Sequence, residues 1–189
     1  FCSILPKTPP APVIRITGAA ISSDSPTQPD DDSSLASNFS GKLNEELIKP
    51  IRNKWKGKLV LKGVASEQDT QDAIRMGFDG IIVSNHGGRQ LDAAEATITS
   101  LQNITEKYSD KIEIMMDGGL RSGPDIARAM ACGAKFTFMG RSFLYGTAAL
   151  GKNGGDHTIS MFKTQFQQVM DQLCCERVED LPKHLIKLG

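Results

Sequence analysis

The segment 84–92 combines residue types that a solvent-exposed loop does not need. It reads SNHGGRQLD, follows the apolar run GIIVS, and contains one of only three histidines in the chain. His86 can exchange a proton near neutral pH, Arg89 offers a planar guanidinium fork, and Gly87 and Gly88 let backbone groups come close to a ligand. Together they suit a site for an anionic substrate. A lone histidine or an isolated arginine would more often be structural.

Two later segments, DGGLRSG at 117–123 and MGR at 139–141, combine glycines with an arginine. Either segment alone could be only a tight turn. Two such segments about 20 residues apart favour a phosphate clamp at the late strands of a barrel, with Arg121 or Arg141 supplying the charge. The chain has no G-x-G-x-x-G after a strand and no G-x-x-x-x-G-K-[ST], so neither a Rossmann fingerprint nor a P-loop explains them.

Alternating strand and helix patterns must position these segments. Apolar runs predict strands at 58–64, 78–85, 111–119 and 135–141. A Ser66 cap and a final Gly77 predict a helix at 66–77, and the alternation continues with helices at 96–109 and 122–133. This alternation is typical of βαβ units with a parallel sheet, in which ligands bind beyond the carboxyl ends of the strands. We therefore expect the chemistry at Lys62, 84–89, 117–121 and 140–141.

Two further helices flank this region. The pattern at 43–55 is helical, but Pro50 should kink or divide it. A last helix at 158–176 should have one apolar face, formed by Met161, Phe162, Phe166, Val169, Met170 and Leu173.

Composition narrows the class of protein. Lys plus Arg and Asp plus Glu both total 22, which gives no field that would attract nucleic acid. Four cysteines without metal-ligand spacing favour a reducing compartment, and we expect a soluble, intracellular protein. Residues 1–38, rich in proline and acidic polar residues, should form an irregular segment, either a linker or a surface loop. The chain begins with Phe1, which suggests processing or a fragment.

Four segments resemble one family in their order and spacing: LVLKGV, GIIVSNHGGRQLD, DGGLRSGPDI and MGRSFLYG. They are similar to the FMN-dependent α-hydroxy-acid oxidoreductases, which include glycolate oxidases, L-lactate dehydrogenases and flavocytochrome b2. The likeness runs from about residue 39 to the C-terminus, so we expect one domain at 39–189. The family fold is an α/β barrel of the (β/α)8 TIM type. The resemblance implies that this chain forms the carboxyl-terminal half of such a barrel, with four βα units that follow the irregular segment 1–38.

The resemblance also implies roles for individual residues. His86 matches the catalytic general base and Arg89 the residue that binds the substrate carboxylate. Lys62 matches a lysine beside the flavin N1 and O2. The implied FMN-binding residues are Lys62, Ser84, Asp117, Gly118, Gly119, Leu120, Arg121, Gly140 and Arg141. In the family, the aspartate that orients the histidine and a substrate-binding tyrosine lie in the earlier half of the barrel.

The implied activity is FMN-dependent oxidation of a small L-2-hydroxy acid, similar to lactate or glycolate, to the 2-oxo acid. Oxygen, a quinone or a cytochrome would reoxidise the flavin. The family favours tetramers, and the expected location is the cytoplasm, the periphery of the inner membrane or an organelle. The alternative is a truncated half-barrel that binds flavin or phosphate without catalysis, in which 58–64 would be an exposed edge strand. A third interpretation, an isomerase or aldolase barrel, is disfavoured by SNHGGRQLD.

Overall fold

The computed structural model describes residues 13–17, 20–21, 42–43, 45–89 and 91–186. Its main sheet has five strands, all parallel, in the order β1-β4-β5-β6-β7. These strands are β1 (Val13–Thr17), β4 (Lys58–Val64), β5 (Gly80–Val83), β6 (Glu113–Asp117) and β7 (Phe136–Phe138). A separate two-stranded parallel sheet joins β2 (Ala20–Ile21) to β3 (Lys42–Leu43).

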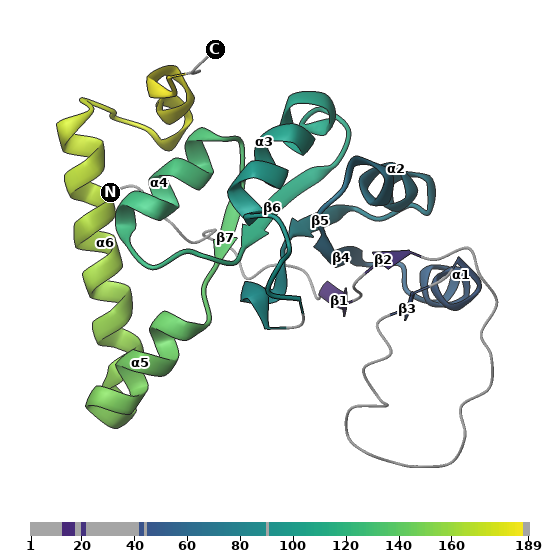
Figure 1. Ribbon diagram of the computed structural model, residues 1–189, viewed down its shortest axis with the longest axis horizontal. Helices are drawn as coiled ribbons and strands as arrows, with labels where there is room; N and C mark the ends of the chain where they lie inside the picture. Colours follow the sequence, from purple (N-terminus) through teal and green to yellow (C-terminus); the bar gives the residue numbers. More distant parts are fainter. Residues whose placement is uncertain (1–12, 18–19, 22–41, 44, 90, 187–189) are drawn as a thin grey trace.

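Helices connect successive strands from β4 onward, as the sequence predicted (Figure 1). They are α2 (Glu67–Arg75), α3 (Thr97–Tyr108) and α4 (Gly123–Ala131), and β7 is followed by α5 (Arg141–Leu150) and α6 (Gly154–Gln172). Two of these helices begin at a capping serine, since the Ser66 hydroxyl accepts from the Asp69 N–H and the Ser122 hydroxyl from the Asp125 N–H. The predicted series of four βα units is therefore confirmed.

The two faces of the sheet carry different side chains. Alternate residues of β4, β5 and β6 pack in the main core together with α2 and α3, namely Leu59, Leu61, Ile81, Val83, Ile114 and Met116. Because successive side chains of a strand point to opposite faces, Lys62 and Asp117 share the other face. This alternation places two charged side chains on the side of the sheet away from the helical core.

The α-helical predictions needed two corrections. Helix α1 (Glu45–Lys54) runs through Pro50 undivided. Helix α6 begins at Gly154 and ends at Gln172, earlier at both ends than predicted, and Met161 is 39% exposed instead of joining the apolar face. Phe162, Phe166 and Met170 are buried in a second core cluster that also includes Ile126 and Ala127 of α4.

The N-terminal expectation also changes. The segment 1–38 contains β1 and β2, and the rest of it lies outside the described residues. β1 pairs with β4 from Val13↔Lys58 to Thr17↔Lys62, so β4 is not the edge strand that we expected. The sheet instead ends at β1 and at the short strand β7, where Phe138 is 37% exposed. No described helix is long and apolar enough to cross a membrane.

Candidate active site

Lys62 is the centre of a polar cluster on the face of the sheet away from the helices. It lies in β4 two residues before the strand ends, at a register shift that accompanies Gly63 with φ of 99°. Its Nζ lies 2.7 Å from Oδ2 of Asp117 and donates a hydrogen bond of 3.0 Å to Oγ of Ser84. The side chain of Lys62 is only 11% exposed, so this carboxylate supplies the counter-charge that a buried ammonium needs.

The second carboxylate oxygen of Asp117 differs from the first. Its Oδ1 is buried and has no hydrogen-bond partner among the described residues, and the same holds for Oγ1 of Thr97. A buried acceptor without a donor costs free energy, and native proteins leave few of them. A bound ligand that carries hydroxyl or N–H groups would supply the missing donor to Asp117.

The histidine loop follows β5 directly. His86–Gly88 forms a single 3₁₀ turn, in which His86 has φ of 54° and Gly87 φ of 68°. The His86 N–H donates to Oγ of Ser84 at 3.0 Å, and the Gly87 N–H donates to Oδ1 of Asn85 at 2.9 Å. Ser84 therefore links the lysine cluster to the histidine loop. Arg89, next along the chain, is exposed.

Arg141 reaches the same region from the end of the edge strand β7. It is the first residue of α5, after β7, and its Nη2 donates a hydrogen bond of 2.8 Å to the carbonyl oxygen of Gly87. A Cβ at position 87 would lie 2.7 Å from that nitrogen, so only glycine fits without a shift. The structure thus brings the MGR segment against the histidine loop.

Arg121 lies on the loop after β6. Its guanidinium carbon is 5.7 Å from the ring centroid of Tyr145 in α5, an arrangement that suits a cation–π contact. Its backbone N–H donates to Oδ2 of Asp125. Burial raises the pKa of Asp125, but hydrogen bonds from Ser122 and from the Arg121 N–H, with the charge of Arg128, hold that pKa below its usual value. The loop is therefore tied to the start of α4 by an ionised carboxylate.

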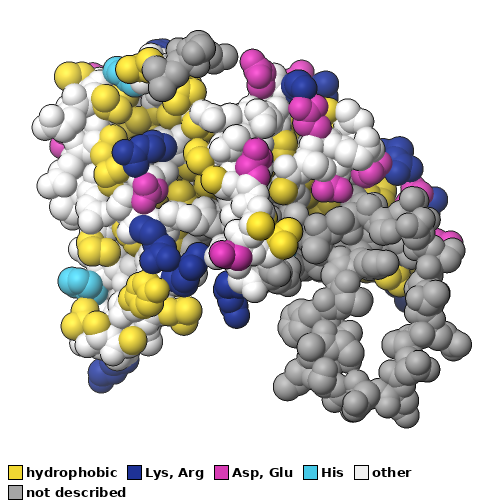
Figure 2. All heavy atoms as spheres, viewed as in Figure 1, with side chains coloured by type: hydrophobic (Ala, Val, Ile, Leu, Met, Phe, Trp, Pro, Cys, Tyr) yellow, Lys and Arg dark blue, Asp and Glu magenta, His cyan; other side chains and the backbone are white. Residues whose placement is uncertain are grey.

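The glycines of these two loops leave open space. An ideal Cβ built at Gly119 or at Gly140 meets no heavy atom within 4 Å. Figure 2 shows basic side chains gathered between α4 and α5, beside apolar side chains of α5. Open backbone next to Arg121 and Arg141 fits a phosphate group. Leu120 differs from its neighbours, because its side chain is buried in the main core and only its backbone can face a ligand.

Three residues of this region were not predicted from the sequence. The Asn85 side chain accepts from the Gly87 N–H, and the Tyr145 ring lies near the Arg121 guanidinium. Thr97 lies close to Gly118, because a Cβ built at that glycine would be 2.7 Å from Oγ1 of Thr97. Asn85 stood inside the quoted motif, and its type is common in turns where the side chain accepts from the backbone two residues on. Tyr145 stood in the segment MGRSFLYG, but nothing in its type pointed to Arg121, and Thr97 gave no signal.

Comparison with known proteins decides the family. Residues 7–188 match the model of the FMN-dependent dehydrogenases. The chain belongs to this family. The match begins at residue 7, well before residue 39, where we expected the likeness to start. FMN is the expected cofactor, since the family is FMN-dependent. The open glycines, the two arginines and the unpartnered oxygen of Asp117 fit that group.

Individual relatives agree with the family assignment. An L-lactate dehydrogenase of Actinobacillus pleuropneumoniae serotype 5b is 38% identical over 149 residues, which are 79% of this chain and 39% of the relative. An L-lactate dehydrogenase of Alcaligenes faecalis is 36% identical over 152 residues, covering 80% of this chain and 40% of the relative. A solved structure of mandelate oxidase with benzoyl-formic acid superposes with a TM-score of 0.71 at 33% identity, covering 76% of this chain and 43% of that one.

The chain thus spans about two fifths of the length of the relatives that it matches. Its parallel sheet with alternating helices superposes on less than half of the mandelate oxidase chain. These findings confirm the predicted fold, half of a (β/α)8 barrel, which in complete form closes eight parallel strands into a ring.

Proposed function

We propose that this chain forms the flavin- and substrate-binding half of an enzyme that oxidises a small L-2-hydroxy acid to the 2-oxo acid. The observation that carries the proposal is the cluster of buried Lys62 and Ser84 with half-buried Asp117, connected through the Ser84 hydroxyl to the backbone of His86. Such a group joins a fixed positive charge to a residue able to accept a proton. The activities named for the lactate dehydrogenases and mandelate oxidase agree with it.

Each residue has a defined task in this proposal. FMN, when bound, supplies the acceptor for the two electrons that leave the hydroxy acid. His86 accepts the proton released from the substrate, and the fork of Arg89 holds the substrate carboxylate and so fixes the orientation of the reacting carbon. Lys62 would supply positive charge on the face of the sheet away from the helices, which suits the negative charge that a flavin gains when it accepts the two electrons.

The other residues that we propose to bind FMN follow β5, in the case of Ser84, or lie at the ends of β6 and β7. Arg121 and Arg141 would hold the phosphate, with backbone N–H groups near Gly119 and Gly140 as additional donors. Oδ1 of Asp117 would accept from a hydroxyl or N–H of the cofactor. The final electron acceptor, whether oxygen, a quinone or a cytochrome, stays a prediction, as do a homotetramer and a cytoplasmic location.

The function is tested with variants of the two residues at the histidine loop. The chain is combined with the amino-terminal part of a lactate dehydrogenase relative, and FMN binding and oxidation of L-lactate, glycolate and mandelate are measured. His86→Ala should lower turnover by about 10²- to 10⁴-fold while FMN stays bound. Arg89→Lys should chiefly raise KM, because a point charge cannot replace the bidentate fork. Full activity in either variant would contradict the assigned roles.

A second candidate function is flavin binding without catalysis, and the open edge at β7 favours it. Helix α5 has no buried residue along its described length, and its Leu144 and Tyr145 are 67% and 60% exposed. We expect residues 1–189 expressed alone to bind FMN weakly, to aggregate readily and to oxidise 2-hydroxy acids negligibly, because an open sheet cannot enclose the substrate. Adding the amino-terminal half of a relative should restore at least FMN binding. Steady lactate turnover by 1–189 alone, with stoichiometric flavin, would exclude this candidate.

A further inference from the structure

The backbone of the histidine loop is held in an unfavourable conformation by side chains around it. His86 has φ of 54°, in the left-handed region that residues with a Cβ rarely adopt. Such a conformation persists only where neighbouring groups fix it, and it is common at functional sites. The groups that fix it here therefore determine where the imidazole lies.

Asn85 contributes most of these restraints. Its Oδ1 accepts a hydrogen bond of 2.9 Å from the Gly87 N–H, and its backbone oxygen accepts one of 3.1 Å from the Gly88 N–H. Its Nδ2 donates at 3.2 Å to the carbonyl oxygen of Glu95. The Glu95 side chain is itself fixed, because its Oε2 accepts from the Ser100 hydroxyl of α3 at 2.6 Å. One amide thus ties the turn that carries His86 to the start of α3.

The loop after β6 is shaped to leave room for this amide. A Cβ at Gly118 would lie 2.7 Å from Oδ1 of Asn85 and 2.7 Å from Oγ1 of Thr97, closer than real Cβ atoms come to other heavy atoms. Gly118 has φ of 90°, which also favours glycine. The side chain of Asn85 is therefore confined between the histidine loop and the loop that carries Asp117.

We propose that Asn85 is a positioning residue, which holds His86 in its reactive orientation without touching substrate or cofactor; this inference rests on the proposed function. Only an amide can do both tasks, since one end must accept from Gly87 and the other must donate to Glu95. A carboxylate at position 85 would keep the first bond and set an acceptor against the Glu95 carbonyl. Two restraints do not depend on Asn85: the Ser84 hydroxyl on the His86 N–H and Arg141 on the Gly87 carbonyl.

The first test is spectroscopic, needs no activity, and uses this chain, isotope-labelled, in complex with the unlabelled amino-terminal part of a lactate dehydrogenase relative. With three histidines in the chain, the imidazole signals of His86 can be assigned by comparison with His86→Gln. In Asn85→Ala, hydrogen exchange of the Gly87 amide should become faster, and the shifts and pH titration of the His86 imidazole should change. In Asn85→Asp, the Gly87 amide should stay protected while the His86 signals still move. Ser66→Ala, which removes a helix cap at the start of α2, is the control and should leave both readouts unchanged.

The second test uses the complex with the amino-terminal part of a relative. Asn85→Ala should lower kcat about 10- to 100-fold, with smaller changes in KM and in the Kd for FMN, because a small displacement of the base mainly affects the chemical step. Its pH–rate profile should shift, which a purely structural change would not cause. Asn85→Asp should recover part of kcat.

The outcomes separate this proposal from the proposed function. Unchanged Gly87 exchange and unchanged His86 signals in Asn85→Ala would overturn the positioning role. Shifted His86 signals, with no 2-hydroxy-acid oxidation by the wild-type complex, would support the positioning role and refute the proposed function. If Asn85→Ala does not fold, Asn85→Asp decides: loss of Gly87 protection in that variant would refute the assigned hydrogen bond, and retention with shifted His86 signals would support it.

Discussion

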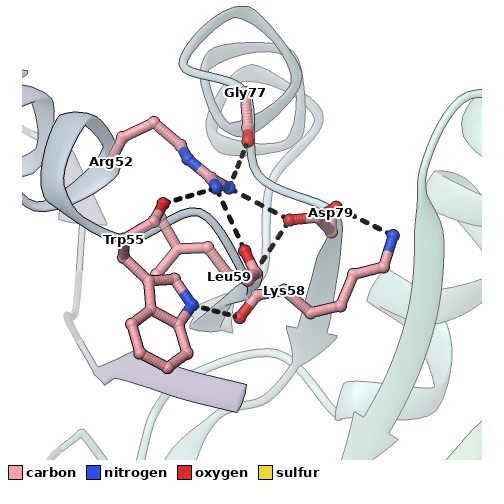
Figure 3. A network of polar contacts seen from close by, with 7 residues as sticks. Arg52, Trp55, Lys58, Leu59, Gly77 and Asp79 are labelled. Carbon is pink, nitrogen blue, oxygen red and sulfur yellow. Dashed lines mark hydrogen bonds and ion pairs between the residues drawn. The ribbon is translucent and has the colours of Figure 1, made fainter. Parts of the chain in front are cut away.

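The two ends of the parallel sheet both carry ion pairs, but the carboxylates of these pairs differ in how fully they are hydrogen-bonded. At the amino-terminal end, Asp79 accepts hydrogen bonds from the Leu59 N–H at 2.9 Å, from Arg52 at 3.1 Å and from Lys58 at 3.0 Å (Figure 3). Arg52 also donates to the carbonyl oxygens of Trp55, Gly57 and Gly77. Both oxygens of this carboxylate have donors within the protein.

At the carboxyl-terminal end, the polar groups are only partly paired. Lys62 binds one oxygen of Asp117, while the other oxygen and the Thr97 hydroxyl are buried without a partner among the described residues. The loops there contain His86 and four glycines with positive φ, at positions 87, 88, 118 and 119. The amino-terminal end thus pairs its polar groups within the fold, whereas the described part of the carboxyl-terminal end leaves acceptors and backbone open, as the proposed function requires.

The largest expected effect on stability is at Asp79. Asp79→Ala leaves a backbone N–H and two cations without their shared acceptor, so we expect the free energy of unfolding to fall by about 2 kcal/mol. Urea denaturation measures the change, and FMN affinity in the complex should stay as in the wild type. A loss of FMN binding without a loss of stability would reverse the comparison between the two ends.

A smaller effect on stability is expected when Asp79 is protonated at low pH. Burial raises the pKa of Asp79, but the Leu59 N–H, Lys58 and Arg52 together hold it below the usual 3.8. The unfolded chain therefore binds this proton more readily than the folded one. The stabilisation is fully present above about pH 4 and is lost as the pH falls through the folded pKa.

Comparing Asp79→Ala with the wild type isolates this contribution. The difference in free energy of unfolding between them should be constant from pH 5 to 7 and should shrink below about pH 4, as the wild-type carboxyl becomes protonated. Other carboxylates with lowered pKa, such as Asp125, act equally in both proteins. A difference that grows toward low pH would contradict the assignment.

The smallest effect should come from Thr97, and it should have the opposite sign. Thr97→Val removes a buried hydroxyl that has no partner among the described residues, while keeping the β-branched shape. We expect the free energy of unfolding of the ligand-free protein to rise by about 1 kcal/mol. Ser100→Ala, which breaks the hydrogen bond to Glu95 in the same helix, is the matched control and should be destabilising. A destabilised Thr97→Val would show that the hydroxyl is satisfied and that this end of the sheet is not held open for a ligand.

Local sequence determined the elements that carry the site. Helix starts at Ser66 and Ser122, apolar strands at 58–64 and 80–83, and glycines in the two late loops are local features, so period and capping sufficed to place them. The local pattern was misleading at Pro50. Because proline lacks a backbone N–H and disfavours the helix interior, we expected it to kink or divide the helix, but α1 continues through it undivided.

Contacts between distant strands were decided only by the tertiary structure. The family resemblance identified Lys62 and Asp117 as two separate FMN-binding residues. Their ion pair depends on the alternation of side chains along β4 and β6 and on the pairing of both strands with β5. The pairing of β1 with β4, and the reach of Arg141 to Gly87 over 54 positions, were equally invisible in the local pattern. Period and propensity specify which face a residue takes within its own element, whereas the partner across that face depends on strand order and register, which the packed chain alone sets.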